Sequence, residues 1–150
     1  MAIFVINEWL WADASGGNGT QAQRQAFEFI TKLATSEDQI VVIEGSRFDQ
    51  KTWSVCKSNS TVAIGLVKTY LTNVRQNSDR CLLLKPDEVA DIPENLASST
   101  NPDDHYLIRA QRSVTGATIV TTDTSLRDAV LGAGLPCLSR EEFVRAYLGV

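Results

Sequence analysis

Histidine is almost absent from this chain, which narrows the chemistry that the protein can perform. His105 is the only histidine among the 150 residues. One histidine by itself cannot build a histidine-based metal site or a Ser-His-Asp arrangement. Because His105 stands at the beginning of a segment with helical apolar spacing, we interpret it as a polar residue in the first turn of a helix.

Cysteine is also scarce, and its spacing excludes two common uses. Cys56, Cys81 and Cys137 are odd in number, lie far apart and form no CxxC pair. A disulfide framework and a zinc ribbon are therefore not indicated. Each cysteine has an apolar neighbour in the sequence, so we expect buried free thiols and a protein of the reducing cytoplasm.

Long hydrophobic runs are missing as well. No apolar run approaches the roughly 18 residues that a membrane-spanning helix requires, so we expect no membrane segment. The apolar run 2–6 has no basic leader and is soon followed by Asn7 and Glu8. We interpret this run as a strand and not as a signal peptide.

Excess positive charge is absent too, since the net charge is −4. A protein that binds nucleic acid through a broad basic face is usually positive. A nucleic-acid substrate is still compatible with this balance, because metal ions bound to an acidic cluster reverse the local sign of the charge. A chain with 43% hydrophobic and 21% charged residues is typical of a globular protein, and 150 residues fit one domain, 1–150.

Apolar spacing along the chain predicts strands that alternate with helices. The predicted strands are 2–7, 39–43, 81–84, 117–122 and 135–138. Thr20 and Ser60 are expected to cap two helices, the second of which continues to Arg75, and further helices are predicted from about Ser46 to Lys57, from His105 and from about Ser125 to Leu131. Ser139 and Glu142 form a capping box for a last helix. Residues 85–100 are expected to form a loop with at most one helical turn. The alternation predicts an α/β fold, a three-layer α/β/α sandwich with a short, mainly parallel central sheet.

Two aspartates occupy the positions of greatest functional interest. Asp104 precedes the helix that begins at His105, and Asp123 ends the apolar strand 117–122. Ligands of a parallel sheet bind beyond the carboxyl ends of its strands, so both side chains are expected at one edge. Two carboxylates that meet there would bind a hard divalent cation, which commonly serves phosphate chemistry. Each aspartate could instead simply cap a helix.

The C-terminal half resembles the PIN-like nuclease family. The resemblance rests on three segments: Asp104-His-Tyr-Leu-Ile-Arg-Ala, then Gly116-Ala-Thr-Ile-Val-Thr-Thr-Asp123-Thr-Ser-Leu126, then Gly134-Leu-Pro with a closing helix. The N-terminal strand followed by a polar cluster is similar in outline. The resemblance implies a metal-dependent ribonuclease that cleaves RNA phosphodiester bonds with Mg²⁺ or Mn²⁺, where two ions can hold the attacking and leaving oxygens.

The resemblance also implies which residues bind the metal. Asp104 and Asp123 would be the principal ligands and catalytic acids. Asp49 would be the third acid, with Glu44 as the alternative. Members of the family have an aspartate at the end of the first strand, whereas this chain has Asn7, followed by Glu8. Asparagine offers one neutral oxygen, so either Asn7 or Glu8 would fill the fourth position.

Several alternatives remain open at the level of sequence. Small members of the family are often toxins, which implies an antitoxin protein that covers the acids, and homodimers are common. The replacement at position 7 favours a degenerate PIN-like domain that binds RNA or protein without catalysis. A receiver-like signalling domain would need an aspartate after the third strand, where Lys85 stands. Three further side chains could stack on bases or pack in the core: Trp9, Trp11 and Trp53.

Overall fold

Five short strands form one parallel sheet at the centre of the molecule. The structure is a computed structural model that describes residues 1–150. The strands are β1 (Ile3–Ile6), β2 (Gln39–Ile43), β3 (Cys81–Leu84), β4 (Ala117–Thr121) and β5 (Cys137–Ser139), and they lie in the order β3-β2-β1-β4-β5. Every neighbouring pair is parallel, which confirms the predicted sheet.

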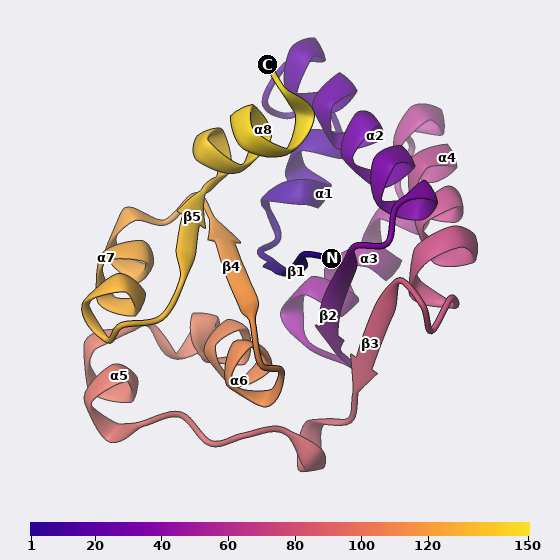
Figure 1. Cartoon of the computed structure of the whole chain (residues 1–150). Helices are drawn as coiled ribbons and strands as arrows, with labels where there is room; N and C mark the ends of the chain where they lie inside the picture. Colours follow the sequence, from indigo (N-terminus) through magenta and orange to yellow (C-terminus); the bar gives the residue numbers. More distant parts are fainter.

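Helices cover both faces of the sheet (Figure 1). One layer contains α2, α4 and α8, and the opposite layer contains α5, α6 and α7. This arrangement confirms the three-layer α/β/α sandwich. The helices are α1 (Trp9–Ala14), α2 (Thr20–Thr35), α3 (Arg47–Cys56), α4 (Thr61–Tyr70), α5 (Glu94–Ser99), α6 (His105–Ser113), α7 (Thr124–Gly132) and α8 (Arg140–Leu148), with short turns η1 (Leu71–Arg75), η2 (Pro86–Glu88) and η3 (Pro102–Asp104).

Alternation along the strands divides the apolar side chains between two cores. Phe4 and Ile6 point into the core on the α2 side, whereas Val5 packs in the core on the α6 side. Successive strand residues face opposite ways, so a strand that is buried on both faces is apolar throughout. Trp9 and Trp11 are both buried in the larger core, which places them in packing and not on an open surface.

The structure differs from the sequence predictions mainly at the ends of elements. Thr20 is the first residue of α2 and does not cap it, because Gly19 holds the cap position without a side-chain bond. The helix α1 was not predicted, since Glu8 at its start provides no side-chain cap. The last strand begins at Cys137, two residues later than expected. The predicted capping box of α8 is confirmed, with Ser139 and Glu142 bonded reciprocally.

The strand order creates a switch point beside the middle strand. From β1 the chain proceeds outward through β2 to β3, and then returns to place β4 on the other side of β1. Ligands of open parallel sheets bind outside the carboxyl ends of the strands at such a reversal. The segments that follow β1 and β4 are therefore where a functional site is expected.

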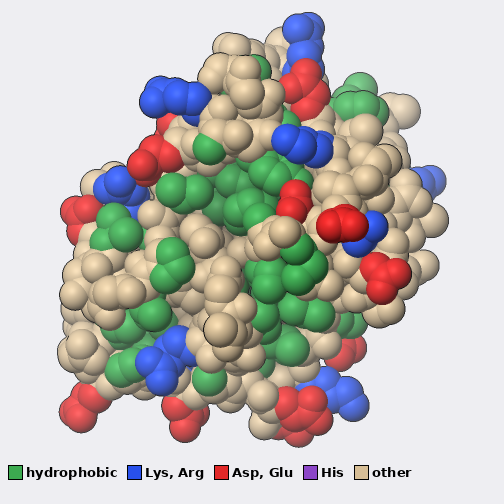
Figure 2. Space-filling view, in the orientation of Figure 1, with side chains coloured by type: hydrophobic (Ala, Val, Ile, Leu, Met, Phe, Trp, Pro, Cys, Tyr) green, Lys and Arg blue, Asp and Glu red, His purple; other side chains and the backbone are tan.

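The molecular surface in the view of Figure 1 is mixed in character. Figure 2 shows hydrophobic side chains near the middle of this face and charged side chains mainly toward its rim. No helix combines the length and the apolar character that crossing a membrane requires.

Candidate functional site

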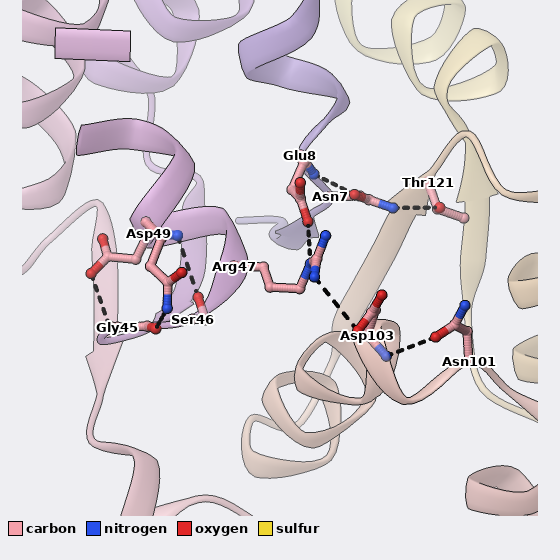
Figure 3. A network of polar contacts seen from close by, with 10 residues as sticks. Asn7, Glu8, Gly45, Ser46, Arg47, Asp49, Asn101, Asp103 and Thr121 are labelled. Carbon is pink, nitrogen blue, oxygen red and sulfur yellow. Dashed lines mark hydrogen bonds and ion pairs between the residues drawn. The ribbon is translucent and has the colours of Figure 1, made fainter. Parts of the chain in front are cut away.

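Asn7 joins the carboxyl ends of β1 and β4. Its Nδ2 donates to Thr121 Oγ1 at 3.0 Å, and its Oδ1 accepts a short hydrogen bond from the backbone N–H of Glu8 (Figure 3). Both ends of the amide are thus occupied within the protein. Asn7 therefore fixes the spacing of the two strand ends, and its oxygen is already partly satisfied.

Glu8 lies at the same edge as Asn7, which simple strand alternation does not predict. β1 ends at Ile6, and Glu8 already has helical backbone angles at the start of α1. Its Oε1 accepts from Arg47 Nε at 3.0 Å, and Arg47 Nη1 lies 3.5 Å from Asp103 Oδ1 (Figure 3). The hydrogen bond to Glu8 is the main reason that the pKa of Arg47 is raised. The Arg47 side chain is 53% exposed, so water weakens both ion pairs.

Asp104 has a carboxylate without any hydrogen bond or ion pair inside the protein. It ends η3 and occupies the cap position of α6, yet its side chain caps nothing. Burial raises its pKa, and the negative charges of Asp123, Asp103 and Glu8 raise it further, while Arg47 lowers it. The fold therefore brings Asp104 into the electrostatic range of Asp123. A simple helix cap does not explain Asp104.

One carboxylate oxygen of Asp123 has a structural role, and the other oxygen has no partner. Its Oδ1 accepts from the backbone N–H of Leu126 at 3.2 Å and so caps α7. Its own N–H donates to Thr121 Oγ1 at 3.0 Å, which holds the turn after β4. The capping alternative is therefore correct for one carboxylate oxygen. The side chain is exposed, and the second oxygen has no partner within the protein.

Asp49 lies in a different environment. Gly45, with φ of 75°, makes the turn after β2 so that Ser46 caps α3, and Asp49 then faces inward. Arg75 Nε and Nη2 donate to its two oxygens at 2.8 and 2.9 Å, and the Gly45 N–H adds a bond of 3.0 Å. Asp49 is not among the charges that act on Asp104, and it forms no group of three acids with Asp104 and Asp123. Glu44, the alternative third acid, is exposed and lines a separate hollow.

The donor set determines what kind of ion the edge fits. Mg²⁺ is commonly held by one or two carboxylates, with water and substrate phosphate completing its octahedron. Asp104 and the free oxygen of Asp123 match that pattern, and Asp103 and Glu8 are further acids whose charges act on Asp104. No group of three or more His, Cys, Asp or Glu residues is arranged to hold an ion by itself. The residues therefore fit one hydrated cation better than a preformed pair of ions.

Two residues of this edge are not among those predicted from the sequence. For Asp103, the available signal is that a second acid stands directly beside Asp104. For Arg47, nothing in the local sequence predicts its position between Glu8 and Asp103. Trp53, considered as a base-stacking residue, lies instead with its ring 5.4 Å from the guanidinium of Arg75.

The fold and the acidic edge define a class of protein: a parallel α/β domain with unpaired carboxylates at its switch point. We call the residues Asn7, Glu8, Arg47, Asp103, Asp104 and Asp123 the acidic edge. No protein-family model matches the chain, and no curated protein matches it.

Proposed function

We propose that this protein is a metal-dependent ribonuclease of the PIN-like type, with its cation at the acidic edge. The observation that supports this most directly is the Asp104 carboxylate, which is half-buried and unpaired beside Asp123, Asp103 and Glu8. Crowded like charges are costly, and a divalent cation would relieve that cost. The proposal rests equally on the motif resemblance over residues 104–126.

Each residue of the acidic edge would have its own role in binding the metal ion or in catalysis. Asp104 and Asp123 would hold Mg²⁺ or Mn²⁺, which when bound neutralises phosphate charge and activates water. Glu8 would accept a proton from the attacking water or contact a water molecule of the ion. Asn7 would keep the strand ends at a fixed spacing. Asp49 is left out of the proposed catalytic set because Arg75 and Gly45 already bond both of its oxygens.

Charge-only substitutions test this proposal. Asp104→Asn and Asp123→Asn keep the side-chain shape, and asparagine can still cap α7 in place of Asp123. We expect each variant to reduce Mn²⁺-dependent cleavage of a mixed RNA by at least about a hundredfold. Asp91→Asn is the matched control, because Asp91 is exposed and has no bonded partner. Equal cleavage by Asp104→Asn and Asp91→Asn would refute the assignment.

A second candidate function is an inactive PIN-like domain that binds RNA or a protein partner. Two observations favour it: Asn7 stands in place of an acid with its amide occupied, and Arg47 already supplies a positive charge between Glu8 and Asp103. Calorimetric titration separates the two functions. An inactive edge should bind no Mn²⁺ in the micromolar to low-millimolar range, whereas the ribonuclease should bind it there.

The proposal extends to partners through the resemblance alone. A toxin of this kind would be neutralised by an antitoxin protein that covers the acidic edge. The protein would act in the cytoplasm, and its three free cysteines favour that reducing compartment. Homodimer formation is part of the same expectation. Growth arrest on expression, absent with Asp104→Asn, would support the toxin role, and light scattering on the purified protein would give the oligomeric state.

A further inference from the structure

A hollow of about 340 Å³ lies next to the acidic edge. It is bounded by the end of β2 with the turn into α3, by the segment that contains Pro86 and Val89, and by η3 with the first turns of α6. Two of its lining residues are direct sequence neighbours of the edge: Ser46 precedes Arg47, and His105 follows Asp104. The volume is at the lower end of the range of about 300–1,000 Å³ that is usual for small-ligand sites.

Four residues that line this hollow carry polar side-chain groups without a bonded partner in the protein. Arg109 and Glu44 are exposed and form no ion pair. His105 Nε2 and the Tyr106 hydroxyl are buried atoms without a hydrogen-bond partner. Buried polar atoms are nearly always paired in native proteins, so each of these two atoms has bonding capacity that the protein itself does not use.

Tyr106 connects the hollow to the acidic edge. It lines the hollow and lies in the first turn of α6, two residues after Asp104, which occupies the cap position of that helix. The start of α6 therefore belongs both to the wall of the hollow and to the acidic edge. A ligand that occupied the hollow would thus reach the side where the proposed cation is bound.

We propose that this hollow binds one nucleotide of an RNA strand, with the base against the rings of His105 and Tyr106 and a phosphate at Arg109. This inference rests on the proposed ribonuclease function, since it supplies the substrate subsite beside the metal. Aromatic rings bind bases by stacking, and a free guanidinium is well suited to phosphate. Ser46 and Glu44 would add a hydroxyl and an acceptor for the polar edge of the base.

Binding without catalysis tests this inference separately. Wild-type protein in EDTA is titrated with each of the four ribonucleoside 5′-monophosphates and, in parallel, with ribose 5-phosphate, and binding is followed by NMR shifts. We expect at least one nucleotide to bind with a dissociation constant near about 1 mM or below, and ribose 5-phosphate to bind at least about tenfold more weakly. Equal binding of ribose 5-phosphate would show a phosphate site only and would overturn the base subsite.

Two variants locate the site. Arg109→Ala should weaken nucleotide binding by about tenfold, because a hydrogen bond between charged groups is lost. Arg112→Ala is the matched control on the same helix and should bind as the wild type does. No nucleotide binding by the wild type, or equal binding by both variants, overturns the inference. Nucleotide binding without any RNA cleavage supports the hollow and contradicts only the ribonuclease function.

Discussion

Two clusters of acids and arginine lie near the carboxyl ends of the strands, and they differ in how completely they are satisfied. In the cluster of Asp49 and Arg75, the carboxylate is 3% exposed, and two guanidinium nitrogens and a backbone N–H bond to its oxygens. At the acidic edge, the Arg47 side chain is 53% exposed, and Asp104 has no partner at all. The carboxylate of the first cluster has a complete set of partners, and we call this the closed cluster. The acidic edge retains carboxylate oxygens without a partner, and we call it the open cluster.

The number of bonded partners separates structural acids from functional acids in this fold. A buried acid with a complete set of partners gains nothing from a metal ion, because its charge is already compensated. A crowded and unpaired acid carries an electrostatic cost that a ligand can remove. The closed cluster should therefore govern stability, and the open one should govern binding.

The largest effect is expected from opening the closed cluster. Asp49→Asn leaves Arg75 without its counter-ion in a site where both side chains are mostly buried. Loss of one partner of a buried pair typically costs about 3–5 kcal/mol, so we expect the free energy of unfolding to fall by about that amount. Urea denaturation measures it. A loss below about 1 kcal/mol would show that the closed cluster is not structural.

A smaller effect is expected from removing the positive charge of Arg47 from the acidic edge. Arg47→Gln takes away a positive charge that competes with a bound metal ion, and it frees Glu8. A unit charge and a doubly charged ion about 8 Å apart repel each other by about 1 kcal/mol in water, so Mn²⁺ should bind about fivefold more tightly. Stability should change by less than about 1 kcal/mol, because the pairs of Arg47 are exposed. Weaker Mn²⁺ binding in this variant would mean that Arg47 supports the site.

The smallest effect is a pH dependence at Asp104. Its folded-state pKa is raised by burial and by Asp123, Asp103 and Glu8, so the stability that its proton provides is complete below the unfolded pKa and is lost as the pH rises through the folded pKa. The Asp104→Asn variant has no carboxyl group at this position, so it does not lose this stability as the pH rises. In metal-free buffer, the variant should gain stability relative to the wild type on going from about pH 3.5 to about pH 7. A relative loss over that range would contradict the assigned direction.

The sequence predicted the fold and part of the edge because both follow from local patterns. Apolar runs and turns fix the strand ends, and parallel strands bring those ends together, which is why Asp104 and Asp123 were expected in one place. The environment of Asp49 depends on Arg75, 26 residues further along the chain in a π-helical turn, and no local pattern predicts that contact. One signal was present: Asp49 lies on the same helix face as the buried residues Phe48, Thr52 and Val55.

The position of Glu8 was also beyond local reasoning. Strand alternation predicts that Asn7 and Glu8 face opposite ways, but that rule ends with β1 at Ile6. The short helix α1 begins directly afterwards and turns Glu8 toward Arg47. A helix of six residues without a capping side chain leaves almost no trace in the sequence.

Binding of a divalent cation by the open cluster can be measured by Mn²⁺ titration calorimetry on three proteins: the wild type, Asp104→Asn and Asp49→Asn, under conditions where each is folded. We expect micromolar to low-millimolar binding by the wild type and by Asp49→Asn, and binding by Asp104→Asn that is weaker by about tenfold or more. Absence of binding in the wild type, or equal binding by Asp104→Asn, would contradict this expectation.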